Sequence, residues 1–315
     1  PGMNATTEEL EALARMVGEF DGLIMSHMRS EDDDQISNSI AELAAQGTYC
    51  RTHISHLKVV YGKGSARGRQ IIDLLKSYES KGVKITADVY PYLAGYTGIS
   101  IVFPAWAKTP SVFETAKKTR NEELRTFLRD KILQRNGPEA TLFGSGPFTG
   151  MTLAEVEEKS GKSYVDILMQ LGPFGASGAY FVMDKDLQDV FITHPEILIC
   201  TDGSPSMRHP RSYGTFARMI QQYVIQDSSI SLTHLIRKAS GLPAEVIGLQ
   251  KRGTILLGNY ADLLVFDPMQ VRENATFVDP FQYASGFDVV ILNGRVVRES
   301  GITRRMDAGK VLLHQ

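Results

Sequence analysis

Several features that would restrict the environment of this 315-residue chain are scarce or missing. Two cysteines, Cys50 and Cys200, are too few for a disulfide framework, which fits a reducing cytoplasm. No apolar run is long enough to span a bilayer, so no membrane association is expected. Lys and Arg number 34 and Asp and Glu 36, giving a formal net charge of −2. This balance provides no strong field for nucleic acid, and it favours an ordinary cytoplasmic globular protein.

The amino-terminal third alternates between predicted helices and strands. Its opening, PGMNATTEEL, has no signal-peptide pattern, and Thr6 with Glu9 fits a helix capping box in mid-fold. Helical stripes separate three apolar strand-like runs, at about 23–27, 50–56 and 83–90. Strand–helix units in series predict a parallel sheet covered by helices.

This regularity breaks at Pro91 and changes again near Gly253. Residues 91–161 are predicted to be a lid or an inserted subdomain of a catalytic domain spanning 1–252. Strand-like GAYFVM and ILICTD, with helical patterns between and after them, complete that domain. In 253–315, TILLG, ADLLVFD and DVVILNGRVVRES predict strands, with Asn293-Gly294 as a hairpin turn. We therefore expect a small carboxyl-terminal β-unit.

Three chemically active side chains end predicted strands. His27 and His56 close the apolar runs in LIMSHMRSE and THISHLK, and Asp202 closes ILICTDG. Histidine and aspartate at the carboxyl ends of barrel strands are typical of a site that holds a metal ion and its water. The structural alternative is that each histidine is a hydrogen-bonded core residue.

Side-chain alternation along the second strand separates its two histidines. His53 and His56 differ by three positions, so only one can face the barrel interior. We assign the interior to His56, on the face of Cys50 and Ile54, and place His53 among the covering helices. Cys50 and Cys200 are then small interior packing residues and not metal ligands.

The remaining candidates have ordinary interpretations. Asp88 either belongs to the functional site or caps the turn before Pro91, and the sequence leaves both open. His194 is predicted at a helix terminus, His234 on a helix surface, and His314 in a mobile tail.

Several motifs together resemble one known family. SHMRSE, ISHLK, ADVYPY, TDGSPSMRHPRSYGTF, RGTILLGNYADLLVFDP and ILNGRVV are similar to the D-aminoacylases, or N-acyl-D-amino-acid deacylases, of the amidohydrolase superfamily. The likeness runs from Pro1 nearly to Gln315. It implies an α/β fold: the carboxyl-terminal part of a metal-dependent (β/α)8 TIM barrel plus a small β-sandwich portion.

The resemblance also implies a reaction and roles for six residues. The family hydrolyses N-acyl-D-amino acids to a carboxylate and a free D-amino acid with the help of zinc. By this likeness the metal ligands are His27 and His56, the proton-transfer residue is Asp202, and the groups around the substrate's α-carboxylate are Lys58, Tyr90 and Arg211.

One part of the family pattern is absent from the sequence. Relatives carry a strand ending in His-x-His and a metal-binding cysteine, and no His-x-His occurs here. We expect an amino-terminal segment or a second polypeptide to supply these ligands, and the chain alone to be inactive. The alternatives are a cyclic-amide hydrolase of the hydantoinase or dihydroorotase kind, or an inactive barrel fragment.

The run YLAGYTGISIVFPAWA, from Tyr92 to Ala107, has no charged residue. It either packs the inserted segment or forms a pocket wall. As a wall it would favour apolar D-amino acids over aspartate and glutamate, because an acidic side chain would be desolvated without a cationic partner.

Overall fold

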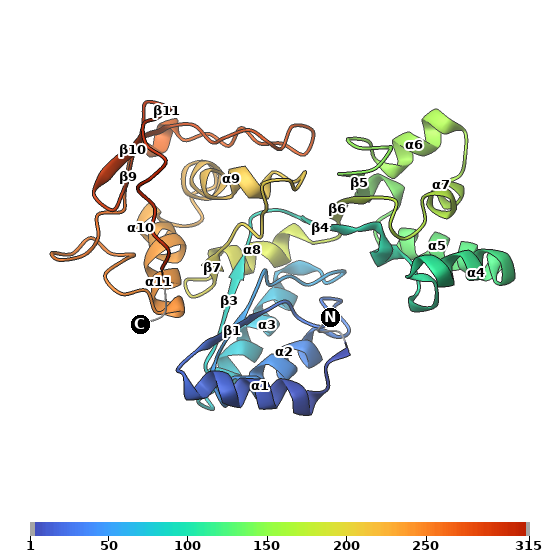
Figure 1. The fold of residues 1–315 in the computed structure, drawn as a ribbon, viewed down its shortest axis with the longest axis horizontal. Coiled ribbons are helices and arrows are strands. Elements are labelled where there is room, and N and C mark those ends of the chain that lie inside the picture. Colours follow the sequence, from blue (N-terminus) through green and yellow to red (C-terminus); the bar gives the residue numbers. More distant parts are fainter. Residues whose placement is uncertain (1–3, 313–315) are drawn as a thin grey trace.

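A parallel sheet with helices on one face forms the amino-terminal part of the computed structural model, which describes residues 4–312 (Figure 1). The sheet has the strand order β1-β2-β3-β7. Its strands are β1 Leu23–Ser26, β2 Arg51–Ile54, β3 Ile85–Val89 and β7 Leu198–Ile199. The associated helices are α1 Thr7–Glu19, α2 Ile36–Gln46, α3 Gly64–Glu79 and α8 Lys185–Thr193. The predicted alternation of helices and strands is therefore confirmed.

The two faces of this sheet differ in chemistry. One face is apolar: Ile54, Ile85 and Val89 are buried in a single cluster with Ile40 of α2 and Ile71 of α3. Burial of such side chains stabilises the fold by about 1.5–3 kcal/mol each. The opposite face carries polar residues of β2 and β3, and it leads to the strand ends where the candidate site lies.

A second unit lies between β3 and α8, at the right of Figure 1. It holds an antiparallel sheet of order β4-β6-β5, made by β4 Ala94–Gly98, β6 Ser177–Phe181 and β5 Thr141–Phe143. Around it are α4 Pro110–Thr119, α5 Asn121–Gln134, α6 Leu153–Ser160 and α7 Tyr164–Leu171, with short helices η2 Ile99–Val102, η3 Ala105–Ala107 and η4 Pro138–Ala140. Because β6 pairs with β4 and β5, this unit continues beyond Gly161, where the sequence interpretation ended it.

The uncharged run from Tyr92 to Ala107 belongs largely to the interior of this second unit. Ile99, Val102 and Phe103 are buried there against α4 and α5 residues. Packing of the inserted unit therefore accounts for these side chains better than a pocket wall does.

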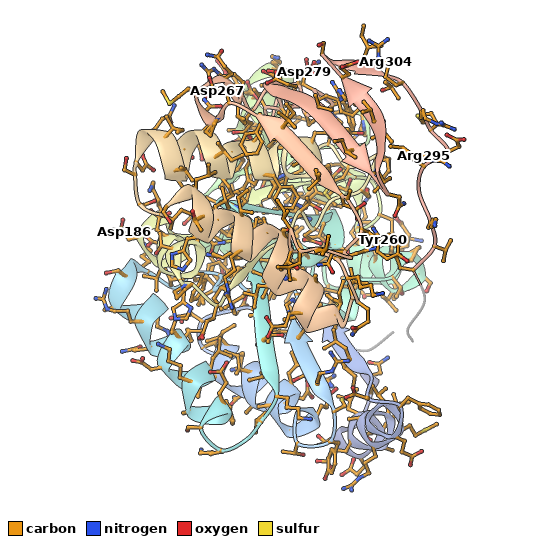
Figure 2. The ribbon with its side chains drawn as sticks, turned by 90° about the vertical axis from the view of Figure 1, so that its left-hand side faces the viewer. Asp186, Tyr260, Asp267, Asp279, Arg295 and Arg304 are labelled. Atoms are coloured by element: carbon orange, nitrogen blue, oxygen red, sulfur yellow. The ribbon has the colours of Figure 1, made fainter. Side chains whose placement is uncertain are left out.

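The carboxyl-terminal part packs a helical layer beneath an antiparallel sheet (Figures 1 and 2). The helical segments are α9 Arg211–Arg218, η5 Met219–Gln226, α10 Leu232–Ile236, η6 Arg237–Gly241 and α11 Leu242–Ile247. The sheet has the order β11-β10-β9-β8, from β8 Leu263–Phe266, β9 Phe287–Leu292, β10 Arg295–Glu299 and β11 Ile302–Thr303, with η7 Pro268–Gln270 after β8. Figure 2 shows the charged side chains of Asp267, Arg295 and Arg304, which lie at or just beyond the ends of strands of this sheet.

Two strand predictions in this part had different outcomes. The Asn293-Gly294 turn is confirmed: both residues have positive φ, 51° and 76°, and β9 pairs antiparallel with β10. The prediction of a strand in TILLG, residues 254–258, is wrong. These residues have no paired neighbour strand among those described, and Leu257 is fully exposed, so β-propensity alone does not form a strand there.

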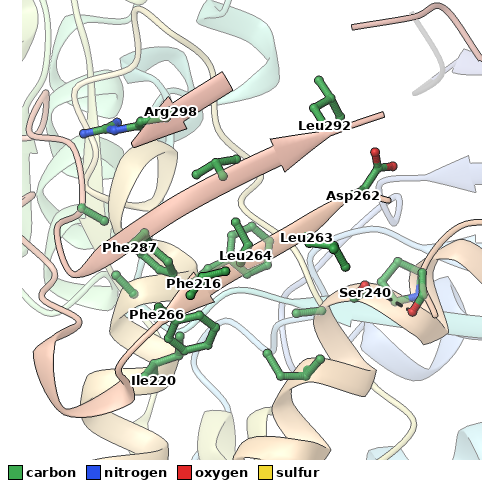
Figure 3. Close-up of a pocket in the computed structure, with 18 of the residues that line it drawn as sticks. Phe216, Ile220, Ser240, Asp262, Leu263, Leu264, Phe266, Phe287, Leu292 and Arg298 are labelled. Carbon is green, nitrogen blue, oxygen red and sulfur yellow. Dashed lines mark hydrogen bonds between the residues drawn. The ribbon is translucent and has the colours of Figure 1, made fainter. Parts of the chain in front are cut away.

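A wide open cavity of about 1500 Å³ separates the helical layer from the sheet. Figure 3 shows its apolar lining, which includes Phe216, Ile220, Leu263, Phe266 and Phe287. The candidate site residues do not line it. None of the helices within residues 4–312 has the length and apolar character that crossing a bilayer requires.

Candidate metal and carboxylate site

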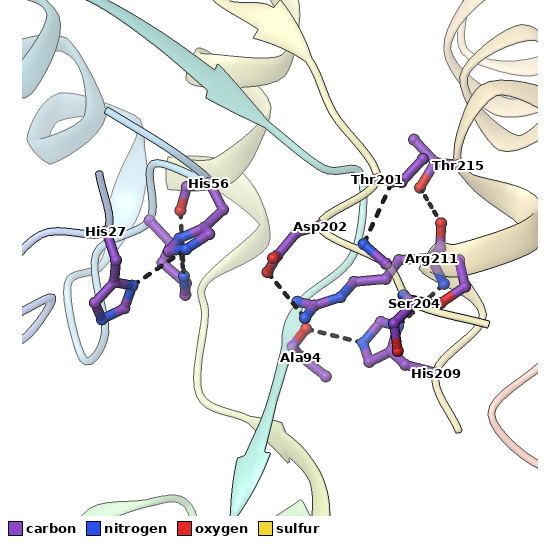
Figure 4. A network of polar contacts seen from close by, with 12 residues as sticks. His27, His56, Ala94, Thr201, Asp202, Ser204, His209, Arg211 and Thr215 are labelled. Atoms are coloured by element: carbon purple, nitrogen blue, oxygen red, sulfur yellow. Dashed lines mark hydrogen bonds and ion pairs between the residues drawn. The ribbon is translucent and has the colours of Figure 1, made fainter. Parts of the chain in front are cut away.

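The structure brings the two predicted metal ligands together at the carboxyl ends of β1 and β2. His27 Nδ1 and His56 Nε2 are 3.1 Å apart (Figure 4). Two ligand atoms at a tetrahedral zinc, each about 2.0–2.1 Å from the ion, are separated by roughly 3.4 Å. The pair therefore fits a metal ion, and the ligand role of these residues stays a prediction.

His56 and Asp202 both have a left-handed backbone, with φ of 45° for each. Such a conformation is costly for a non-glycine residue and is common at functional sites. At His56 it is held by Asp88, whose Oδ1 accepts the backbone N–H of His56. The strand β2 has already ended at Ile54, so a turn, and not the pleat, aims the His56 side chain.

This early end of β2 overturns the assignment of the two histidines to opposite faces. His53 does not lie among the helices: it pairs in register with Thr86 on the polar face, and its Nε2 is 2.9 Å from Asp88 Oδ2. Ile54 packs on the helices instead. Cys50 lies on that helix side too, near Gln46 O, so its predicted interior position is also wrong. Alternation fails because Ser55 and His56 leave the strand.

Asp88 is a buried link between strands and does not cap the turn before Pro91, so that alternative is wrong. One oxygen accepts from His56 and the other contacts His53. Burial works to raise the pKa of Asp88, but its hydrogen bond with His53 lowers that pKa overall. Cys200, half-buried beside Asp88, has a thiol whose pKa is raised by burial, so it stays protonated. Asp88 thus orients the backbone of His56.

Glu31 completes the histidine cluster, and the sequence interpretation missed it. Its Oε1 lies 3.3 Å from His27 Nδ1, 3.1 Å from His56 Nδ1 and 2.5 Å from Lys58 Nζ. Burial works to raise the pKa of Glu31, but Lys58 and the histidines hold it at about 2, so the carboxylate is charged. The available signal was its position four residues after His27 in SHMRSE. Within residues 4–312, His27, Glu31 and His56 form a cluster able to hold a metal ion.

Lys58 and Tyr90 lie buried beside this cluster and offer hydrogen-bond donors that an anion could accept. Lys58 Nζ lies 5.7 Å from the Tyr90 ring centre. Burial works to lower the pKa of Lys58, but Tyr90, Glu31 and Asp202 raise it overall, so the ammonium is charged. The Tyr90 hydroxyl is buried without a hydrogen-bond partner, and burial raises its pKa. An unpaired buried hydroxyl is costly unless a ligand satisfies it.

Arg211 also contacts the Tyr90 ring, with its Cζ 4.6 Å from the ring centre. Its Nη2 is 2.9 Å from Asp202 Oδ2, and its Nε has no partner in the described structure. His209 holds the first residue of α9, Arg211, in place. Its Nδ1 accepts the Arg211 N–H at 3.1 Å, and its Nε2 donates to Ala94 O at 3.0 Å (Figure 4). Burial and the nearby Arg211 lower the pKa of His209 to about 3, so it is neutral.

The six predicted site residues therefore lie around one region, with His53 and His209 beside it. Two other histidines have the positions that the sequence predicted. His194 ends α8 and His234 is exposed on α10, as predicted. His314 lies outside the described residues.

Comparison with known proteins gives concordant matches. Residues 182–297 match the model of the Amidohydrolase family. A D-aminoacylase of Alcaligenes xylosoxydans xylosoxydans is 30% identical over 318 residues, covering 99% of this chain and 59% of that protein. A D-aminoacylase mutant solved in complex with copper chloride superposes with a TM-score of 0.79 at 29% identity, covering 98% of this chain and 60% of the other.

An N-acyl-D-glutamate deacylase from Bordetella bronchiseptica, solved with zinc and a phosphonate inhibitor, has a TM-score of 0.77 at 28% identity. That match covers 96% of this chain and 58% of the other. The chain thus spans about three-fifths of the length of these relatives. The matches confirm the predicted resemblance and the predicted α/β fold class, part of a TIM barrel with a small β-unit.

Proposed function

We propose, from its similarity to D-aminoacylases over nearly its whole length, that this chain takes part in zinc-dependent hydrolysis of N-acyl-D-amino acids. The products would be the carboxylate of the acyl group and the free D-amino acid. The two unpaired cysteines support a cytoplasmic location.

The observation that carries the proposal is a pair of buried polar atoms with no partner beside a histidine pair. Tyr90 Oη and Arg211 Nε are both buried and unsatisfied. Both belong to side chains packed on one another, next to the cation of Lys58. A carboxylate has the charge and the acceptor atoms to satisfy all three groups, and arginine can bind it at two points.

The metal would be held by His27 Nδ1 and His56 Nε2, the two nitrogens that face each other. When bound, a zinc ion lowers the pKa of water to about 7 and polarises a carbonyl. Asp202 would accept the proton of the attacking water at its carboxylate and return it to the leaving amine nitrogen. Arg211 supports this role by holding the Asp202 carboxylate through Nη2.

We further propose that the remaining metal ligands come from a polypeptide segment outside these 315 residues. The support is the exposure of His27, whose side chain is 58% exposed against 12% for His56, and the position of β1 at the end of the strand order, with no second neighbour among the described strands. Three or four protein ligands are the norm for zinc. Without that segment the chain is expected to be inactive.

A paired assay tests the proposed function. N-acetyl-D- and N-acetyl-L-amino acids are compared in the protein with zinc and after chelation, with apolar and acidic side chains in the panel. Zinc-dependent release of acetate from the D-isomers is expected. The assay uses the protein together with the segment that supplies the remaining metal ligands. In that protein, equal turnover of both isomers, turnover of cyclic amides alone, or no turnover would reject the proposed function.

A further inference from the structure

We propose that Glu31 is a positioning residue that sets the hydrogen-bonding state of His56 and fixes Lys58, joining the metal side to the carboxylate side. This inference rests on the proposed function for its meaning. The observation behind it is the set of contacts of Glu31 Oε1, which lies within 3.3 Å of nitrogen atoms of His27, His56 and Lys58.

The backbone holds Glu31 in place before any ligand binds. Val60 N–H donates to Glu31 O at 2.8 Å, and the next residue, Asp32, forms a parallel bridge with Val60. The loop after β1 is thereby pinned to the loop after β2, which carries His56 and Lys58. The Glu31 side chain is also largely buried, with 14% exposed. The carboxylate is therefore a fixed part of the site.

The two ring nitrogens of His56 face different partners. Nε2 faces His27 Nδ1, whereas Nδ1 faces Glu31 and Lys58. The nitrogen lone pairs of an imidazole diverge, so one neutral ring cannot present both to the same ion. If Nε2 binds the metal, the proton must sit on Nδ1, and Glu31 Oε1 at 3.1 Å is its acceptor.

Lys58 competes for the same nitrogen. Its Nζ lies 2.7 Å from His56 Nδ1 and 3.2 Å from His56 O. An ammonium has only donors, so it can contact Nδ1 only while that atom lacks its proton. Glu31 accepts from either partner, and Lys58 Nζ is 2.5 Å from it. When Nδ1 keeps its proton, Lys58 stays on Glu31 and its other donors turn toward Tyr90 and a bound carboxylate.

The test compares Glu31→Ala and Glu31→Gln with Asp33→Ala and Asp33→Asn in the metal-binding form of the protein. Asp33 lies in the same loop but pairs with Arg67, so its variants match the charge change outside the site. The readouts are the zinc dissociation constant by chelator competition, zinc stoichiometry, thermal stability, and KM and kcat. Metal binding reports on Glu31 even if the wild type hydrolyses no N-acyl-D-amino acid.

Glu31→Ala should weaken zinc binding by about 10- to 100-fold at unchanged stoichiometry. Glu31→Gln keeps an acceptor for Nδ1 but not the charge, so it should weaken zinc binding less and raise KM more than it lowers kcat. The Asp33 variants should match the wild type in both. Unchanged zinc affinity in Glu31→Ala would overturn the proposal, because Glu31 would be merely structural. Complete loss of zinc in Glu31→Ala would also overturn the proposal, because Glu31 would then be a metal ligand. A wild-type protein that binds no zinc would overturn it as well.

Discussion

The carboxylate side of the site and its metal side are built to different degrees within this chain. Lys58, Tyr90 and Arg211 are 7%, 1% and 2% exposed, and each is packed on another member of the set. His27, by contrast, has a side chain that is 58% exposed. The side chains on the carboxylate side are all buried, whereas on the metal side His56 is 12% exposed and His27 is open to solvent.

Under the proposed function, this difference predicts which half of the reaction the chain would support by itself. Preorganised, water-excluded cations bind an anion strongly, because they need no reorganisation when it arrives. Two histidines give a metal ion only part of the coordination that zinc prefers. Under the proposed function, substrate recognition would rest on this chain, and metal retention would need further ligands.

The largest effect is expected on the metal side. His56→Ala removes one of the two facing nitrogens, so zinc content and turnover should fall to background. His234→Ala, on an exposed helix position, should retain both. Metal analysis after gel filtration measures this. Full zinc occupancy in His56→Ala would show that the histidine pair does not hold the ion.

Asp202→Asn tests the residue at which the two sides meet. The amide keeps the size but cannot accept the water proton, so kcat should fall by about two orders of magnitude or more with zinc still bound. Asp262→Asn is the matched control, because Asp262 also pairs with an arginine, Arg252, outside the site. A loss below tenfold would leave Asp202 a structural partner of Arg211.

Tyr90→Phe tests the carboxylate side alone. Hydrogen bonds to charged groups contribute about 1.5–3 kcal/mol, so KM should rise roughly tenfold or more while zinc content stays the same. Thermal stability should not fall, because the hydroxyl has no partner in the folded chain. Tyr180→Phe removes another buried, unpaired hydroxyl, in the inserted unit, and should leave KM unchanged. Equal KM values in the two variants would remove Tyr90 from the site.

The smallest expected effect comes from comparing two buried lysines, Lys58, which has an ion-pair partner, and Lys238, which has none among the described residues. Lys238 is as buried as Lys58 but only donates to Ile192 O, and burial lowers its pKa to about 7. Between pH 7 and the unfolded pKa near 10.5, the unfolded chain binds more protons, so stability rises with pH. From pH 6 to 8.5 the wild type should gain about 2 kcal/mol relative to Lys238→Met.

Urea unfolding at these pH values measures the difference, with exposed Lys84→Met as the control. Lys238→Met should be most stabilising at pH 6, where the wild type must bury a charge. A constant difference between wild type and Lys238→Met across this range would contradict the prediction.

The sequence predicted the strand–helix order and the gathering of His27, His56 and Asp202, because parallel strands bring their carboxyl ends to one edge. It did not predict which way His53 faces, because the end of β2 at Ile54 is set by the turn that Asp88 holds. That hydrogen bond joins residues 32 positions apart, and no local pattern encodes it.

Glu31 was missed for a related reason. It lies in a loop, and its contacts depend on the bridge between Asp32 and Val60. At TILLG a strand was predicted that the structure does not have. The local β-propensity is present there, but no neighbouring strand pairs with these residues among those described. Pairing between distant segments, and not composition, decided each of these cases.

The division into two sides is tested most directly by substrate binding to the protein after its metal has been removed. Calorimetric titration with an N-acetyl-D-amino acid should give a dissociation constant within about tenfold of KM, with no turnover, because Lys58, Tyr90 and Arg211 are in place without the ion. Loss of binding together with the metal would contradict this account, since the carboxylate side would then not be preformed.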